Sequence, residues 1–176
     1  YLTLVSIIVI WSCFLYFMGI NTPDDTDIII VFFAITIYVI FDHFDGLQAK
    51  KTGTGSPLGE ILDHYSDVFN GSIILYLLFR ILQIELGGIF YLVIWANLVA
   101  FTVTYLEQSI RKELYFGKIG SLEGVLLIQF IVVSLMTSQG KYFWLKNKLF
   151  DIPLHVLLVI GLILGVIYTV VGSIRR

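Results

Sequence analysis

Long apolar segments, interrupted by short polar stretches, dominate the pattern of this chain. The pattern predicts helices over six apolar segments, at residues 1–20, 27–41, 61–82, 88–106, 122–138 and 152–174. A helix that crosses a membrane needs about 20 consecutive apolar residues, so most of these segments are near spanning length. The second segment is short if it ends at Asp42, which predicts that its helix continues through Lys50. The third helix is expected to begin near Ser56 or Pro57, a pair suited to the cap and first turn of a helix.

The composition identifies the class of protein. Of the 176 residues, 58% are hydrophobic and 14% are charged, whereas soluble domains are usually far more polar. We therefore expect an all-α integral membrane protein, in which a bundle of six transmembrane helices forms a single domain over residues 1–176. Because residue 1 already lies at the edge of an apolar segment, we also expect that an N-terminal part of the domain is missing from this sequence.

The distribution of Lys and Arg predicts the orientation of the helices. With six spans, one side of the membrane receives Lys50, Lys51, Arg111, Lys112, Lys118, Arg175 and Arg176. The other side receives Arg80, Lys141, Lys146 and Lys148. Cytoplasmic loops carry the excess of positive charge, so the junction of the second and third helices is expected to face the cytoplasm, and the aromatic stretch at 142–144 is expected to form an interfacial belt on the far side. The net charge of −2 and the scattered cations argue against nucleic-acid binding.

Four aspartates gather at the junction of the second and third helices. Asp42 and Asp45 are three residues apart, and Asp63 and Asp67 are four apart, so each pair lies on one face of its own helix. Two neighbouring helices joined by a short loop can direct these faces toward each other. Two unit charges about 5 Å apart repel by roughly 3 kcal/mol at an effective dielectric constant near 20, so the convergence requires a cation. Carboxylate oxygens suit Mg²⁺ or Mn²⁺.

A plainer interpretation is that these acids are surface residues in water. For Asp42 taken alone, this interpretation explains the sequence as well as a functional role does, because helix ends at a membrane interface are often charged. It is much weaker for both pairs together, because Asp63 and Asp67 fall inside the third apolar segment, where acids are costly unless they line a polar cavity. Gly46 and Gly59 stand beside the acids, where they serve either turn geometry or the close approach of a ligand to the backbone.

The strings "DHFDGLQAK" and "GEILDHYSD" resemble the signature of the CDP-alcohol phosphotransferase family, D-x2-D-G-x2-A-R-x8-G-x3-D-x3-D. The matching residues are Asp42, Asp45, Gly46, Ala49, Gly59, Asp63 and Asp67. One fixed position differs, because Lys50 stands where the family usually has arginine. The charge is retained, but a planar two-pronged contact with phosphate becomes a point contact.

The resemblance implies an active site at the cytoplasmic ends of the second and third helices. In this family the four aspartates bind one or two divalent cations, Mg²⁺ or Mn²⁺, that hold the diphosphate of a CDP-linked substrate. By the same resemblance, Asp67 takes the proton of the acceptor hydroxyl. The resemblance also implies substrate contacts from Gly46, Ala49, Lys50 and Gly59, and a homodimer.

Three further features bear on the branch of the family. "SPLGEILDHYSD" resembles the choline and ethanolamine phosphotransferases, in which a histidine follows the third aspartate, as His64 does here. His64 is therefore a second candidate for the base, with a hydrogen-bonded interfacial histidine as the alternative. Glu123, within "GKIGSLEGVLL", either contacts substrate or belongs to the start of a helix. Val68 stands where the phosphatidyltransferase branch often has lysine, which argues against a glycerol-phosphate acceptor.

The sequence thus predicts an enzyme of phospholipid synthesis. It would move a phosphocholine-like or phosphoethanolamine-like group from a CDP-alcohol to a lipid hydroxyl such as that of diacylglycerol, and release CMP. One alternative is a phosphatidyltransferase that uses CDP-diacylglycerol and a small alcohol such as inositol. A cation transporter is the alternative outside enzymes. The expected location is the inner membrane in a bacterium, or the endoplasmic reticulum or Golgi in a eukaryote.

Overall fold

The computed structural model describes residues 2–53, 56–111 and 121–175, except for the side chains of Lys50, Pro57, Leu58, Glu60, Asp63 and Ser121. These residues form seven helices and one two-stranded hairpin. The helices are α1 (Leu2–Met18), α2 (Asp25–Thr52), α3 (Pro57–Ile81), α4 (Gly88–Arg111), α5 (Ser121–Leu135), α6 (Ser138–Lys146) and α7 (Leu154–Arg175). The hairpin consists of β1 (Lys148–Leu149) and β2 (Ile152–Pro153), which pair antiparallel.

The ends of α2 and the start of α3 follow from local side-chain chemistry. Asp24 caps α2 by accepting hydrogen bonds from the backbone amides of Thr26 and Asp27, at 2.8 and 3.0 Å. The helix continues to Thr52 and ends at Gly53, whose φ of 64° is a left-handed conformation that glycine adopts without strain. Ser56 caps α3 by accepting from the Gly59 amide at 3.0 Å. The predicted continuation of the second helix and the predicted start of the third are both confirmed.

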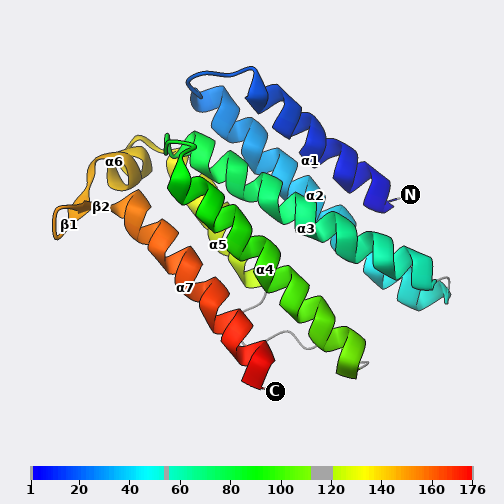
Figure 1. The fold of residues 1–176 in the computed structure, drawn as a ribbon. Helices are drawn as coiled ribbons and strands as arrows, with labels where there is room; N and C mark the ends of the chain where they lie inside the picture. The colour runs from blue at the N-terminus through cyan, green and yellow to red at the C-terminus, as the bar shows by residue number, and fades with distance from the viewer. Residues whose placement is uncertain (1, 54–55, 112–120, 176) are drawn as a thin grey trace.

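The long helices run alternately in opposite directions along one bundle (Figure 1). α1 packs against α2 and α3, α4 packs against α3 and α7, and α5 packs against α2. One end of the bundle carries the start of α1, the junction of α2 with α3, and the ends of α4 and α7 (Figure 1). At the opposite end, α6 lies across the bundle and the hairpin follows it. A buried core of aliphatic and aromatic side chains joins the helices, including Ile10, Phe17, Ile35, Leu77, Phe79 and Ile131.

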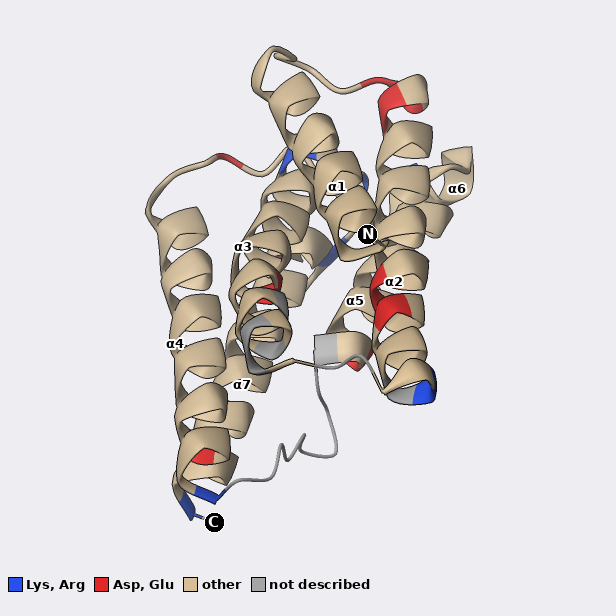
Figure 2. Cartoon of the chain, turned by 90° about the vertical axis from the view of Figure 1, so that its right-hand side faces the viewer, with Lys and Arg blue, Asp and Glu red and all other residues tan. Residues whose placement is uncertain are grey.

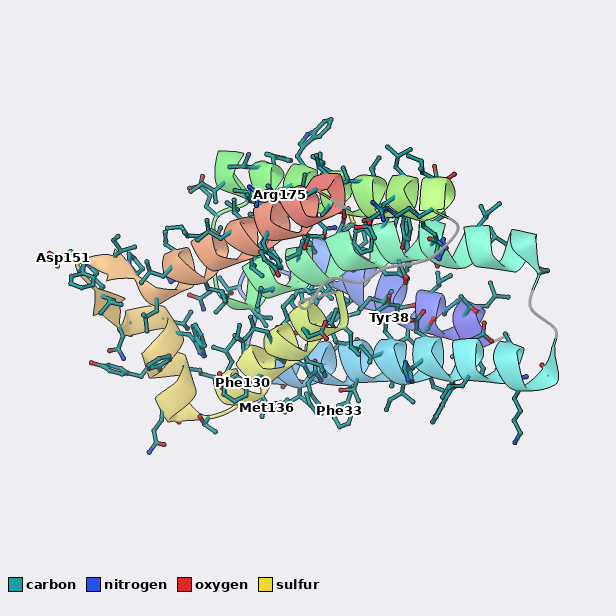
Figure 3. All side chains as sticks on the ribbon, turned by 90° about the horizontal axis from the view of Figure 1, so that it is seen from below. Phe33, Tyr38, Phe130, Met136, Asp151 and Arg175 are labelled. Carbon is teal, nitrogen blue, oxygen red and sulfur yellow. The ribbon has the colours of Figure 1, made fainter. Side chains whose placement is uncertain are left out.

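The outer surface is that of a membrane protein. Phe33 of α2 and Phe130 of α5 project outward (Figure 3), with 55% and 66% of their surface exposed. Many other large apolar side chains of the helices are exposed as well. An outer surface of this kind indicates contact with lipid rather than water. Lys, Arg, Asp and Glu lie mainly toward the ends of the bundle and on α2 and α3 (Figure 2). The chain is thus an integral membrane protein.

The candidate spans differ in number from the expected six. Among the described residues, α2, α4 and α7 are long and apolar enough to cross a membrane, and a fourth span results if α5 and α6 are counted together. α1 is shorter, with 17 residues, and α3 carries its acids in its first turns. The expected fifth span at 122–138 ends at Leu135, because the chain bends by 115° between α5 and α6. The supported architecture is therefore an all-helical bundle with three to four long apolar candidate spans.

The bend between α5 and α6 depends on a glycine. Thr137 caps α6 by accepting from the Gly140 amide at 3.0 Å, and a methyl group on Gly140 would overlap the backbone carbonyl of Ser134. We expect Gly140→Ala to lower the melting temperature of the purified protein by roughly 5 °C, because overpacking of this kind costs about 1–3 kcal/mol. In contrast, Gly88→Ala adds a methyl group that meets no atom within 4 Å. Equal melting temperatures of the two variants in a thermal-unfolding assay would contradict this role of Gly140.

Candidate active site

The acid-bearing turns of α2 and α3 lie beside each other because the two helices are antiparallel neighbours with a short connection at one end of the bundle (Figure 1). Asp42 and Asp45 lie in the last part of α2, and Asp67 lies in the first half of α3. All three side chains are half-buried. The acids of α2 and α3 thus lie toward the same end of the bundle, and their convergence on one centre stays a prediction.

Tyr38 connects the two helices at this point. Its hydroxyl donates a hydrogen bond to Oδ1 of Asp67 at 3.0 Å, and its own side chain is buried, with 7% exposed. Tyr38 is one helical turn before Asp42, and the Asp42 carboxylate is near enough to interact electrostatically with the same hydroxyl. Asp42 and Asp67 therefore share a neighbour, although they come from different helices.

Asp45 contacts the first helix. Its carboxylate accepts a hydrogen bond from the hydroxyl of Thr3, at the start of α1. α1 therefore covers one side of the acidic region. Two predicted members of the site, the side chains of Lys50 and Asp63, lie outside the described part of the chain, so their roles stay predictions.

The chemistry of this region fits a hard divalent cation, because its polar groups are carboxylate and hydroxyl oxygens from adjacent helices. Within the described residues, however, no group of three or more His, Cys, Asp or Glu side chains is placed to hold a metal ion. The carboxylate of Asp63 lies outside the described side chains. The set of four aspartates as metal ligands therefore stays a prediction.

The predicted small residues have different surroundings. A methyl group added to Gly46 would meet no atom within 4 Å, so open space borders the backbone next to Asp45, as a bound ligand would require. A methyl group on Gly59 would lie 3.1 Å from Oγ of Ser56, and the cap of α3 thus gives Gly59 a structural explanation. Ala49 is half-buried in the last turns of α2.

His64 and Asp67 are close on α3 but contact different helices. The imidazole of His64 stacks on the ring of Tyr105 in α4, with ring centroids 4.4 Å apart and an angle of 18° between the planes. Asp67 instead contacts Tyr38 of α2. The stacking gives His64 a structural role that the sequence does not reveal.

A large cavity lies on the α4 side of α3. Its volume is about 1050 Å³, and its walls come from α3, α4, α5 and α7. Most of the wall is apolar, including Ile74, Leu75, Val93, Ile128 and Leu162, while Tyr105 and Glu123 contribute polar atoms. Glu123, predicted as a substrate contact, thus lines the cavity from the first turn of α5, and His64 stacks on a ring of its wall.

The sequence pattern reveals neither this cavity nor the hydrogen bond from Tyr38 to Asp67. Tyr38 reads as one more residue of an apolar helix, and the cavity needs side chains from four helices. A usable signal is the spacing of Gly161 and Gly165, four residues apart on α7, since both line the cavity and a methyl group on either meets no atom within 4 Å.

Comparisons with known proteins give the relatives of the chain. The family model described as CDP-alcohol phosphatidyltransferase matches residues 1–171. Cholinephosphotransferase 1 of Saccharomyces cerevisiae is 31% identical over 109 residues, which cover 58% of this chain and 27% of that protein. Human cholinephosphotransferase 1 is 28% identical over 137 residues, 76% of this chain and 33% of that protein. CDP-diacylglycerol--serine O-phosphatidyltransferase of Encephalitozoon cuniculi is 33% identical over 95 residues, 53% of this chain and 25% of that protein. The chain thus spans less than half of the length of these relatives.

Proposed function

The chain belongs to the CDP-alcohol phosphatidyltransferase family, and we propose that it transfers a phospho-alcohol from its CDP conjugate to a lipid hydroxyl, with release of CMP. The observation that carries the proposal is the position of α3, which has the Tyr38-bound carboxylate of Asp67 toward α2 and a large apolar cavity toward α4. A phosphocholine-like or phosphoethanolamine-like group is favoured by the "LDHYSD" sequence around His64 and by the cholinephosphotransferases among the relatives. The cation-transporter alternative has no support from the relatives.

The proposed architecture places the reaction at a membrane surface. α1 to α5 and α7 would each cross the bilayer, with α6 at the far interface, which gives the six spans expected from the sequence. By the distribution of Lys and Arg, the junction of α2 and α3 would face the cytoplasm, where a CDP-linked substrate is available. The homodimer expected from the family resemblance stays a prediction.

In the proposed site, Asp42, Asp45, Asp63 and Asp67 would hold a divalent cation, Mg²⁺ or Mn²⁺. When bound, the cation would offset the negative charge of the diphosphate and of the departing CMP. Lys50, in the last turn of α2, would add a positive charge for the same phosphates. Gly46 would leave room for the nucleotide beside the backbone of α2.

The proposed chemistry is a single displacement at phosphorus. The acceptor hydroxyl oxygen forms a bond to the phosphorus that carries the alcohol, and the bond from that phosphorus to the bridging oxygen of CMP breaks. CMP leaves with the electron pair of that bond, and the hydroxyl proton passes to a base. Asp67 is the first candidate for the base, because its carboxylate, which accepts a hydrogen bond from Tyr38, can take up a proton. His64 is the second candidate.

The cavity between α3, α4, α5 and α7 fits the lipid acceptor. Its apolar wall suits acyl chains, and its polar residues Tyr105 and Glu123 suit the glycerol end of a lipid. His64, which stacks on Tyr105, is close to Asp67 along α3. The lipid hydroxyl would therefore approach from the α4 side of α3, and the nucleotide from the α2 side.

A donor assay separates the proposal from the phosphatidyltransferase alternative, which the Encephalitozoon cuniculi relative favours. The purified chain in liposomes is given either radiolabelled CDP-choline with diacylglycerol or radiolabelled CDP-diacylglycerol with inositol or serine. We expect CMP release from the first pair alone. Release from the second pair alone would replace the proposal by the alternative, and ion flux without CMP from either pair would remove both.

Filling the cavity should affect the lipid acceptor more than the nucleotide. We expect Gly165→Trp to raise the KM for diacylglycerol by about tenfold or more, because an indole group would occupy space that an acyl chain needs. The KM for the CDP-alcohol should change little. Ile160→Trp is the matched control, since Ile160 is on the same helix, 43% exposed and outside the cavity wall. Equal acceptor KM values for the two variants would argue against this binding site.

A further inference from the structure

A chain of polar side chains joins α1, α3 and α2 beside Asp67. The indole Nε1 of Trp11 in α1 donates a hydrogen bond to Oδ1 of Asn70 in α3, at 3.2 Å. The Asn70 side chain also interacts with the hydroxyl of Tyr38 in α2. That hydroxyl in turn donates to Oδ1 of Asp67, at 3.0 Å. The order of contacts is therefore Trp11, Asn70, Tyr38 and Asp67.

The burial of this chain needs an explanation. Asn70 has 1% of its surface exposed and Tyr38 has 7%, and both lie among apolar side chains of the bundle core. Burying an amide costs free energy that its hydrogen bonds only offset. A leucine of similar size at position 70 would pack against the same neighbours without that cost. Stability of the bundle therefore does not account for an asparagine at this position.

The directions of the hydrogen bonds suggest what Asn70 does. Because its Oδ1 accepts the indole proton, its NH₂ group is the part left to face the Tyr38 oxygen. The oxygen of Tyr38 then accepts from Asn70, which leaves the phenolic proton for Asp67. The last torsion of an aspartate side chain otherwise has only a broad, roughly two-fold preference. A carboxylate that accepts a fixed donor keeps one orientation.

We propose that Tyr38 and Asn70 are positioning residues that fix the orientation of the Asp67 carboxylate. This inference rests on the proposed function for its effect on turnover, but its effect on the acidic site can be measured without substrate. Residues that orient the groups around a metal or a reacting atom typically change affinity or activity by about 10- to 100-fold when they are removed. The expected effects of both residues fall in this range.

The test uses Tyr38→Phe and Asn70→Leu with Tyr76→Phe as the matched control. Tyr76 is also a tyrosine that bonds between helices, since its hydroxyl donates to the Phe17 carbonyl at 3.3 Å, but it lies far from the acids along α3. We expect Tyr38→Phe and Asn70→Leu to lower kcat about 10- to 100-fold, with the KM for the CDP-alcohol, measured at saturating Mn²⁺, changed less than about twofold. Tyr76→Phe should keep the kcat of the unchanged protein.

The double variant Tyr38→Phe/Asn70→Leu gives a sharper test. If Asn70 acts through Tyr38, the double variant should have the kcat of Tyr38→Phe alone, because residues in one hydrogen-bond chain are not additive. Independent packing defects would instead multiply their losses. A kcat equal to the product of the two single losses would overturn the inference.

A measurement without substrate separates this inference from the proposed function. Mn²⁺ is titrated against each purified variant and followed by its effect on thermal unfolding. We expect Tyr38→Phe to weaken the apparent Mn²⁺ affinity about 10-fold relative to Tyr76→Phe. If the unchanged chain turns over no CDP substrate but shows this difference, the proposed function fails and the positioning role stands. If Tyr38→Phe equals Tyr76→Phe in kcat and in Mn²⁺ affinity, the positioning role fails and the proposed function stands.

Discussion

Replacing Asp45 by alanine is expected to reduce CMP release by about a thousandfold and to remove stabilisation by Mn²⁺ at the same time. A cation that offsets charge on the phosphates is worth several kcal/mol in the transition state, and about 4 kcal/mol corresponds to a thousandfold change in rate. Loss of a carboxylate from the α2 side of the site should therefore affect metal binding and catalysis together. CMP release and the Mn²⁺-dependent shift in melting temperature measure the two effects.

The control for Asp45 is an aspartate on the same helix. Asp25 lies at the opposite end of α2, where it pairs with Lys141 of α6 and is largely exposed. Exposed ion pairs contribute little to stability, typically about 0–1 kcal/mol, so Asp25→Ala should keep both activity and the response to Mn²⁺. If Asp45→Ala behaves like Asp25→Ala, the acids of α2 do not bind the metal.

Asp67→Asn is expected to lower kcat by about 10²- to 10⁴-fold, the usual contribution of a general base, with a smaller effect on binding of the CDP-alcohol. Asparagine has the same shape and can still accept the Tyr38 hydrogen bond, but it cannot take the proton of the acceptor. Single-turnover rates and equilibrium binding of the donor separate the two quantities. Equal losses in rate and in donor binding would indicate that Asp67 is a metal ligand and not the base.

His64→Ala provides the comparison for Asp67. Because His64 stacks on Tyr105, its loss should disturb the wall of the cavity and cost less than about tenfold in kcat. A greater loss in His64→Ala than in Asp67→Asn would make the histidine the base. Asp151→Asn is a neutral control, since Asp151 is exposed in the hairpin at the far end of the molecule (Figure 3).

The sequence predicts the helices where local chemistry determines them. The Ser56-Pro57 pair and Gly53 set the start of α3 and the end of α2 within a few residues, because caps and left-handed turns depend on the residues at those positions. The bend after Leu135 is missed, because the close approach of the Gly140 backbone to the Ser134 carbonyl exists only once the turn has formed. The signal available in the sequence is Thr137 followed by Gly140, which together form the cap of α6.

The stretch at 142–144 shows a similar limit. Sequence predicts an interfacial aromatic belt, and Tyr142 and Phe143 are exposed as a belt requires. Trp144, however, turns inward and donates a hydrogen bond to Oγ of Ser134 at 2.7 Å. The composition of an amphipathic helix does not reveal which aromatic side chain turns inward, because this depends on how the helix lies across the bundle.

The candidate site is predictable only for residues that recur at a helical interval along the sequence. The intervals between the aspartates place each pair on one face of its helix, and the structure gives Asp42 and Asp67 a common neighbour in Tyr38, whereas the described contact of Asp45 is with Thr3 of α1. Tyr38, Asn70 and Trp11 come from three helices and share no interval. Their contact depends on the packing of α1 against α2 and α3, which the sequence pattern does not specify.

The position of α3 has a consequence for the two reactants. A nucleotide conjugate is soluble in water, whereas a diglyceride is soluble only in the bilayer. An enzyme that joins them must therefore bind one substrate from water and the other from lipid. In the proposed enzyme, α3 separates the acidic region toward α2 from the apolar cavity toward α4. Asp67 and His64 lie close together along this helix. The nucleotide conjugate then reaches α3 from water and the diglyceride reaches it from the bilayer. Neither reactant has to cross the medium in which it is insoluble.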